Sequence, residues 1–214
     1  MLCFREMVLF DTSSARHMFR ITMHALRRQR MRKVVYGGAC SLDGYLARED
    51  GGVDWLMFSD EVAELMKDSW SRFDTMLMGR KTYEVAVANT PAGSAGDSEI
   101  ETYVFSTTLD AKNHKGATIV STGAGDLVRS LKAKDGKDIC VMGGGVLAAS
   151  LLEAGVIDEV GFNIHPILLG TGIPSFHRIA KQTELELVEC KQLRNGCVYV
   201  LYNVKHQAER SPNP

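Results

Sequence analysis

A buried strand that leads through three glycines into a helix is the feature that most constrains this chain. Residues 139–142 are apolar, Gly143–Gly145 follow, and residues 146–154 have the apolar face of a helix. Such a turn presents backbone N–H groups at the positive end of the helix dipole, where a phosphate can bind. A second strand-to-helix turn, Gly79–Thr82, follows residues 75–78. Two phosphate-binding turns predict one long ligand anchored at both, such as a dinucleotide.

The order of the apolar segments predicts the fold class. From residue 33 onward, short strands alternate with helices, which is typical of an α/β domain with a largely parallel sheet. A chain of 214 residues with 45% hydrophobic residues can bury the core of one such domain. Strands are expected near 33–40, 75–78, 102–106, 117–121, 139–142, 157–165, 184–193 and 197–204. Helices are expected near 60–72, 81–89, 125–133 and 146–154.

Local signals define the ends of two helices. Ser59 is a residue type that caps helix N-termini and precedes the first helix. Gly155 suits the position just after the last helix, where glycine is favoured. Five apolar residues at helical spacing predict one buried stripe on the first helix: Val62, Leu65, Met66, Trp70 and Phe73.

The five cysteines are odd in number and form no C-x-x-C pair, which argues against a disulfide framework or a zinc site. Asn195-Gly196 predicts a two-residue hairpin turn, which would place Arg194 opposite Cys197 and Cys190 opposite Leu201. The two thiols of the hairpin would then not face each other. The six histidines show no ligand spacing, so no metal site is expected. A reducing compartment, the cytoplasm, is the simpler location.

Charge and hydropathy exclude two classes of partner. The net charge of −1 gives no basic field for a nucleic acid, and no apolar run reaches the roughly 18 residues of a membrane span. Residues 1–30 differ from the rest, with six Arg and only two acidic residues. Little serine and no clear amphipathic repeat favour a poorly ordered or non-native extension over a transit peptide. The expected domain is 31–206, with a tail at 207–214.

Basic and hydroxyl side chains at strand ends support anion binding. Arg80 and Lys81 oppose the dipole of the second helix, which is easier to understand if an anion binds there. Ser106–Thr108 follow another strand and offer hydroxyl and N–H donors to a ribose phosphate. Plainer interpretations remain: the glycines can make a tight turn, the cations can form a solvated helix start, and Ser106–Thr108 can be ordinary turn residues.

Acidic residues gather in and after the long loop at 41–59. A C=N group that accepts a hydride needs a carboxyl-bearing pocket for binding or protonation. Candidate carboxylates are Asp43 after the first strand and Asp60, Glu61 and Glu64 in the first helix, and Trp55 is expected to cover the same cleft. Most acids in such loops are merely solvated, and Asp-Gly is also a common turn pair. A lone histidine before proline, His165, is interpreted as structural.

Seven motifs in order, from about Arg32 to Lys205, resemble the dihydrofolate reductase-like family that includes the riboflavin-biosynthesis reductase domain. The similarity is greatest to stand-alone bacterial members. The motifs are Ser41-Leu42-Asp43-Gly44-Tyr45-Leu46-Ala47, Asp54-Trp55-Leu56, Met78-Gly79-Arg80-Lys81-Thr82-Tyr83-Glu84, Val104-Phe105-Ser106-Thr107-Thr108-Leu109, Met142-Gly143-Gly144-Gly145, Ile157-Asp158-Glu159 and Pro166-Ile167-Leu168-Leu169-Gly170-Thr171-Gly172.

This resemblance implies an eight-stranded, mostly parallel sheet flanked by helices, with NADPH bound at the strand ends. It implies that the two glycine turns hold the diphosphate, that Ser106 lies by the adenosine phosphate, and that Gly143-Gly144 forms a cis peptide. The C-terminal hairpin would be antiparallel. The cofactor-binding residues expected on these grounds are Ala39, Gly79, Arg80, Lys81, Thr82, Ser106, Thr107, Thr108, Gly143, Gly144, Gly145, Val146 and Leu147.

Departures from the family pattern bear on the substrate. In the riboflavin-pathway reductase, Lys or Arg usually follows the Ser-Leu-Asp-Gly motif, whereas here Tyr45 follows Gly44. In that enzyme a segment that binds the sugar phosphate follows the second turn, whereas residues 85–96 of this chain contain no such segment. Folate reductases place one carboxylate about five residues past a tryptophan. Counting from Trp55 reaches Asp60, whereas counting back from Gly79 points nearer Glu64, so the acid stays unassigned.

The sequence therefore predicts an NADPH-dependent reductase that transfers a hydride to a pterin-like or pyrimidine-like heterocycle. Asp43 and Glu64 are the catalytic candidates, and Asp43, Trp55, Asp60 and Glu61 are the substrate-binding candidates. One alternative is the phosphoribosylaminouracil reductase of riboflavin biosynthesis, and another is a non-catalytic nucleotide-binding module. The expected partners are a small heterocyclic substrate and a second copy of the chain in a homodimer.

Overall fold

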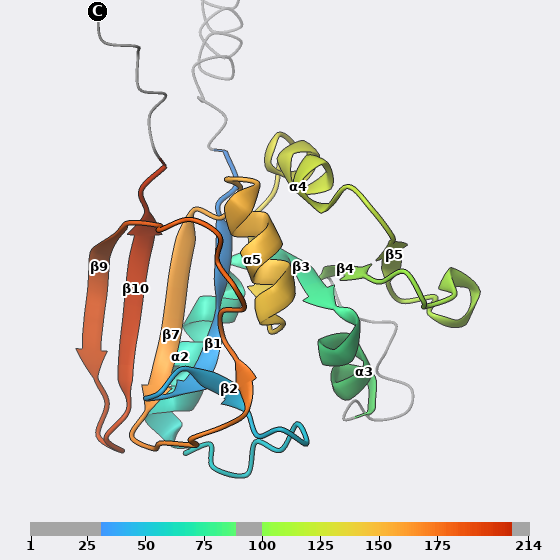
Figure 1. The fold of residues 1–214 in the computed structure, drawn as a ribbon. Coiled ribbons are helices and arrows are strands. Elements are labelled where there is room, and N and C mark those ends of the chain that lie inside the picture. Colours follow the sequence, from blue (N-terminus) through green and yellow to red (C-terminus); the bar gives the residue numbers. More distant parts are fainter. Residues whose placement is uncertain (1–30, 89–99, 207–214) are drawn as a thin grey trace, which may run out of the picture. The chain divides into compact units, whose positions relative to one another are not determined.

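The computed structural model describes residues 31–88 and 100–206, so the predicted N-terminal extension and C-terminal tail lie outside it. An eight-stranded sheet with the order β5-β4-β3-β6-β1-β7-β10-β9 forms its centre (Figure 1). Its first six strands in that order are mutually parallel, whereas β10 runs antiparallel to both of its neighbours. The strands are β1 Val34–Ser41, β3 Phe73–Gly79, β4 Glu101–Phe105, β5 Thr118–Val120, β6 Asp138–Met142, β7 Glu159–His165, β9 Leu185–Gln192 and β10 Val198–Val204. The predicted fold class is confirmed.

Helices cover both faces of this sheet. Figure 1 shows α5 (Gly145–Glu153) and α4 (Ala124–Lys132) in front and α2 (Asp60–Ser71) behind. The other helix of the sheet is α3 (Arg80–Ala88), and a short 3₁₀ helix spans Ala111–Asn113. Each predicted helix is present, with ends that differ from the expected ones by at most one residue.

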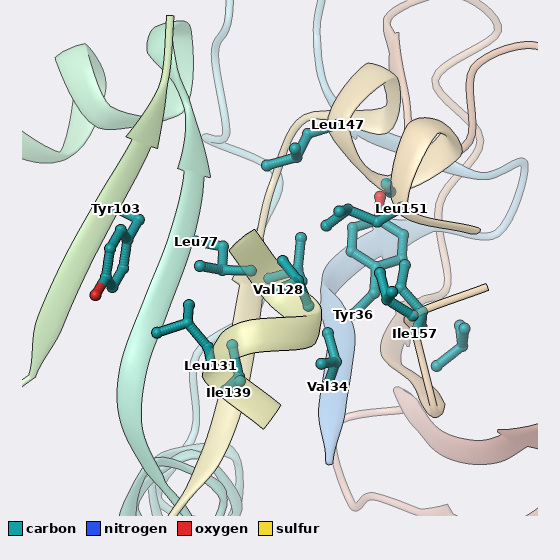
Figure 2. Close-up of a cluster of buried hydrophobic side chains, with 14 of the residues drawn as sticks. Val34, Tyr36, Leu77, Tyr103, Val128, Leu131, Ile139, Leu147, Leu151 and Ile157 are labelled. Carbon is teal, nitrogen blue, oxygen red and sulfur yellow. The ribbon is translucent and has the colours of Figure 1, made fainter. Parts of the chain in front are cut away.

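The main core lies between α4, α5 and the centre of the sheet. Figure 2 shows Leu147 and Leu151 of α5 and Val128 and Leu131 of α4 beside strand residues such as Ile139. Alternate residues of parallel strands point to the same face, so the β-branched and aromatic residues of β1 and β6 reach this core together. This layer holds the strand ends, and hence the turns that follow them, in fixed positions.

A smaller core lies under α2, where Val62 packs with Leu193 and Cys197. Ser59 caps the helix as predicted, because its side chain accepts a hydrogen bond from the backbone N–H of Val62 at 3.3 Å. The predicted buried stripe is only partly right. Val62 is buried and Leu65 packs partly buried against the same cluster, but Met66 is 43% exposed.

The terminal hairpin differs in register from the prediction. Leu193 N–H donates to the Cys197 carbonyl at 2.9 Å, and Gly196 N–H donates to the Leu193 carbonyl at 3.0 Å. The loop therefore has three residues, and Cys190 pairs with Val200 rather than Leu201. Gly196 has φ +89°, which fits a type I turn followed by a bulge, the second common hairpin loop. The two thiols still do not face each other.

A small antiparallel sheet was not predicted. Its strands are β2 (Tyr45–Ala47) and β8 (Ile173–Pro174), which are too short to show a period in the sequence. The Ser175 hydroxyl donates to the Gly44 carbonyl at 2.9 Å, which ties the segment after β8 to the turn after β1. These contacts place both segments at the edge where the parallel strands end.

Candidate functional site

The carboxyl ends of the parallel strands bring most of the predicted cofactor residues to one edge of the sheet. In the order β4-β3-β6-β1, neighbouring strands end at Phe105, Gly79, Met142 and Ser41. In Figure 1 this is the lower edge, where α3 and α5 begin. Ligands of open α/β sheets bind outside the carboxyl ends of the strands. The fold therefore supports the expected location of the site.

The two glycine turns are in contact with each other. A Cβ atom built on Gly143 would lie 2.6 Å from Oγ1 of Thr82, so the Thr82 side chain packs directly over the glycine turn. Gly143 and Gly144 have φ +61° and +69°, a region that L side chains rarely adopt. At Gly144 the nearest atom to such a Cβ would be 3.9 Å away, which leaves its outer side open to a ligand.

One expectation for the glycine turn needs correction, and a second glycine has a packing role. No peptide bond within the described residues is cis, so the implied cis bond at Gly143-Gly144 is absent and the turn is made by two consecutive positive φ angles instead. Gly145 is buried, and a Cβ there would lie 2.6 Å from the Pro174 carbonyl oxygen. Its small size is thus needed for packing against the segment after β8.

The second turn is open on its outer side. β3 ends at Gly79 and α3 begins at Arg80 without a loop, and a Cβ on Gly79 would meet no described atom within 4 Å. Lys81 is exposed. Arg80 forms an ion pair with Glu84 at 2.9 Å, one helical turn away. Glu84 thus offsets part of the unfavourable Arg80 charge, and Lys81 is the better candidate for a ligand anion.

Ser106 organises the turn after β4. Its Oγ accepts hydrogen bonds from the backbone N–H groups of Thr108 and Leu109, both at 3.1 Å. Thr107 and Thr108 are exposed. The Ser106 side chain therefore shapes this turn, while the hydroxyls of Thr107 and Thr108 are accessible beside the end of β3.

The remaining predicted cofactor residues differ in exposure. Ala39 is half-buried in β1, Val146 is 67% exposed at the start of α5, and Leu147 is buried in the main core (Figure 2). Leu147 can thus contact a ligand only through its backbone. Gly38 was not predicted, yet it is exposed in the central strand, and a Cβ there would meet no described atom within 4 Å. The Gly37-Gly38 pair inside an apolar strand is the sequence signal that would have indicated it.

Asp43 closes a turn with its carboxylate. Its oxygens accept hydrogen bonds from the Ser41 hydroxyl at 2.6 Å and from the backbone N–H groups of Leu169 and Gly170 at 3.2 and 2.8 Å. The Ser41 hydroxyl lowers the pKa of Asp43, and these backbone bonds contribute in the same direction. This geometry favours the turn interpretation: Asp43 ties the end of β1 to the segment after β7.

Among the described residues, no hydrogen bond or ion pair joins the acidic residues of α2 to Asp43. Asp60 and Glu64 are exposed. Glu61 is 18% exposed and accepts a hydrogen bond from the Arg194 backbone N–H at 2.8 Å. Its charge also faces the side chains of Lys191 and Arg194, at 3.9 and 3.7 Å. Glu61 thus fastens α2 to the hairpin, and the catalytic acid stays a prediction.

A buried polar cluster surrounds His165 at the end of β7. The Met57 backbone N–H donates to Nδ1 at 3.2 Å, the Cys197 Sγ lies 3.4 Å from the same nitrogen, and the Asn163 side-chain amide lies 3.3 Å from Nε2. The Trp55 ring packs edge-on against the imidazole, with centroids 5.4 Å apart. His165 was expected to be structural and Asn163 was not singled out. Polar residues at alternate positions of an apolar strand were the available signal.

Burial lowers the pKa of His165, which predicts a pH dependence of stability. The pKa of His165 in the unfolded chain is about 6.5. Below that pH the unfolded chain binds a proton at His165 that the folded chain does not bind. The free energy of unfolding therefore falls by at most about 1.4 kcal/mol for each unit that the pH is lowered. Above that pH the effect disappears. We expect the stability advantage of the wild type over His165→Gln to shrink between about pH 7 and pH 5.5 in urea unfolding. An advantage that is constant with pH would contradict a neutral, buried imidazole.

The described residues contain neither a metal-binding cluster nor a membrane-spanning helix. No group of three or more His, Cys, Asp or Glu residues could hold a metal ion among residues 31–88 and 100–206. No helix in the same part of the chain is both long and apolar enough to cross a membrane.

Comparison with known proteins identifies the family. The model of the RibD C-terminal domain matches residues 32–199. The chain belongs to this family. The uncharacterized protein YwjB of Bacillus subtilis (strain 168) is 36% identical to this chain over 162 residues, which cover 75% of this chain and 92% of YwjB. The family resemblance seen in the sequence is confirmed.

Solved structures agree with the fold. A putative riboflavin biosynthesis protein from Shewanella sp. PV-4 superposes with a TM-score of 0.64 at 25% identity, over 82% of this chain and all of that one. A dihydrofolate reductase from Enterococcus faecalis, complexed with NADP(H), superposes with a TM-score of 0.60 at 16% identity, over 81% of this chain and 97% of that one. The chain therefore has the dihydrofolate reductase-like fold.

Proposed function

We propose that this chain is an NADPH-dependent reductase that transfers a hydride to a pterin-like or pyrimidine-like heterocycle. The observation that carries the proposal is the contact between Thr82 and Gly143, which joins the two predicted phosphate-binding turns into one surface at the strand ends. The similarity to a dihydrofolate reductase complexed with NADP(H) and to a putative riboflavin biosynthesis protein supports it.

The residues at this edge fit a dinucleotide. Gly38, Gly79 and Gly144 each leave open the space that a side chain would fill. The first turn of α3 and the first turn of α5 contain no acidic residue that would repel a phosphate. The four most exposed large apolar side chains of the described residues also lie at this edge, which suits contact with flat apolar rings: Phe58, Leu168, Val146 and Leu42.

When bound, NADPH would supply the hydride, and the chain would bind, orient and exclude water. Backbone N–H groups at the starts of α3 and α5 would hold the diphosphate. Ala39 and Gly38 would let a flat ring approach β1 closely. Trp55, which is buried beside the loop before α2, would cover the substrate and exclude water.

NADPH should bind at least about tenfold more tightly than NADH, because a charge-assisted hydrogen bond to the additional phosphate is worth about 1.5–3 kcal/mol. Lys81 and the hydroxyls of Thr107 and Thr108 are the expected donors. Titration calorimetry of the wild type and of Lys81→Met measures the preference, which should fall in the variant. Lys67→Met, on α2, is the matched control. Equal affinity of the wild type for NADH and NADPH would refute this assignment.

The activity itself is tested by following NADPH oxidation with dihydrofolate, dihydropterins and the phosphoribosylaminouracil substrate of riboflavin biosynthesis. Turnover of any one supports a reductase. Turnover of the phosphoribosylaminouracil alone would support the second candidate, the riboflavin-pathway enzyme, which the Shewanella similarity favours. Tight NADPH binding with no turnover of any substrate would favour a non-catalytic nucleotide-binding module, and no NADPH binding would overturn the proposal.

A further inference from the structure

One face of the terminal hairpin is apolar along almost its whole length. Val200 and Val204 of β10 pack partly buried against the main core, which shows that this face is the one on the side of α4 and α5. Residues directly opposite each other in neighbouring antiparallel strands share a face. The register therefore gives four β10–β9 pairs on this face, which we call the hairpin strip: Val198 with Gln192, Val200 with Cys190, Tyr202 with Leu187, and Val204 with Leu185.

The β9 half of the hairpin strip is exposed to solvent. All eight residues of β9 are exposed, including Leu187 at 55% and Leu185 at 41%. In Figure 1, α4 and α5 lie in front of the middle of the sheet, whereas β9 and β10 lie to one side of both helices. Exposed leucines in neighbouring positions on one face of a sheet are typical of an interaction surface.

The charged residues of β9 lie on its other face. Glu186, Glu189 and Lys191 pair with β10 residues that alternate with those of the strip. Lys191 also lies 3.9 Å from Glu61 of α2, so this face is turned toward α2. An antiparallel hairpin usually turns its apolar face to the protein and its polar face to solvent. In β9 this arrangement is reversed, which indicates that the apolar face has a partner.

A bulge in β9 hinders the addition of another strand to the edge of the sheet. The register with β10 shifts between Leu201 and Tyr202, whose partners are Glu189 and Leu187, so Val188 is the additional residue of the bulge. Bulges and charged side chains on an edge strand disfavour pairing with a further strand. An extended peptide that continues the sheet is thus a poor partner, and the apolar face is the surface that needs cover.

We propose that the hairpin strips of two copies of this chain pack face to face about a two-fold axis. No residue of the strip carries a formal charge, so a charged partner would find no opposite charge there. A second copy presents an apolar surface of the same length and composition, as a two-fold interface requires. Tyr202 and Leu187 form an inner pair of the strip, which places them near the axis. This dimer requires neither NADPH nor the proposed reaction.

The size of the hairpin strip determines the expected strength of the dimer. Strands lie about 4.8 Å apart and side chains on one face repeat about every 6.8 Å along a strand, so eight positions cover about 260 Å² of the sheet. Stable interfaces of standard size bury about 800 Å² on each partner. The strip is smaller, so we expect a reversible dimer with a dissociation constant in the micromolar range rather than an obligate dimer.

Sedimentation equilibrium of the full chain without NADPH measures the dimer, between about 1 and 300 µM, a range that spans micromolar dissociation constants. Leu187→Lys and Leu185→Lys should each weaken the dimer at least about tenfold, because symmetry places two additional cations in one apolar interface. Both leucines are exposed in the single chain, so the variants should fold. Glu189→Gln is the matched control: it changes the net charge by the same amount on the other face of β9 and should dimerise normally.

Cys190 gives a second measurement at the surface itself. Of the four described cysteines it alone is exposed, and Cys3→Ser removes the fifth. In that background, alkylation of Cys190 by iodoacetamide should slow as the protein concentration rises, and the rate should be independent of concentration when Leu187→Lys is added. A monomer at every concentration, a dimer that both lysine variants leave intact, or a Cys190 rate independent of concentration without Leu187→Lys would overturn the proposal.

Discussion

Replacing Arg72 with Met is expected to lower the free energy of unfolding by about 3 kcal/mol, because Arg72 is an ion-pair partner of two carboxylates that are almost fully buried. Arg72 follows α2 and pairs with Asp138 at 3.1 Å and with Glu159 at 2.9 Å. The side chains of these acids are only 7% and 4% exposed. Lys33, the other cation on Glu159, is 40% exposed, and its backbone N–H donates to the Asp138 carboxylate at 3.0 Å. Urea unfolding measures the loss.

Arg80→Met is the matched control for this prediction. It removes the same number of atoms and breaks the Arg80–Glu84 pair, in which both side chains are more than 40% exposed. An exposed pair one helical turn apart contributes about 0.3–0.5 kcal/mol. If the two variants lose similar amounts of stability, the charges around Arg72 are not buried as the structure shows.

Gly144→Ala is expected to weaken NADPH binding about 100-fold while lowering the free energy of unfolding by only about 1–2 kcal/mol. The conformational cost is modest because the Cβ would meet its nearest atom at 3.9 Å, although φ is +69°. The effect on binding is large because the same Cβ would project into the open side of the turn, where backbone N–H groups must approach the diphosphate. Calorimetric titration and thermal unfolding measure the two effects separately.

Gly155→Ala provides the control, because Gly155 has φ +66° and open space around its Cβ position, but lies after the other end of α5. Both substitutions should cost similar stability, and only Gly144→Ala should affect NADPH. Unchanged NADPH affinity in Gly144→Ala would show that the turn is purely structural and would remove the main support for the proposed function.

Features that depend on neighbouring residues in the chain were predictable. The end of α5 is an example: Gly155 N–H donates to the Leu152 carbonyl and Val156 N–H to the Leu151 carbonyl, the paired bonds that a glycine after a helix permits. The Ser59 cap and the apolar strands are equally local. Because parallel strands end at one edge, these elements also implied that the turns at Gly79 and Gly143 would lie together.

The catalytic carboxylate could not be chosen from the sequence, because its role depends on partners far away in the chain. Counting from Trp55 and from Gly79 indicated different acids. The structure adds that Glu61 bonds to the hairpin more than 130 positions away and that Asp43 bonds to the segment after β7. Such contacts leave no periodic pattern around either residue.

The sequence alone thus determined the α/β class, the helices, the strand ends and the two glycine turns, because propensity, capping and hydrophobic period act over a few residues. Only the tertiary structure decided the hairpin register, the β2–β8 pair, the contact of Thr82 with Gly143 and the cluster around His165. Each of these depends on atoms that meet after the sheet has formed, where packing and hydrogen-bond satisfaction select among arrangements that local preferences leave nearly equal in energy.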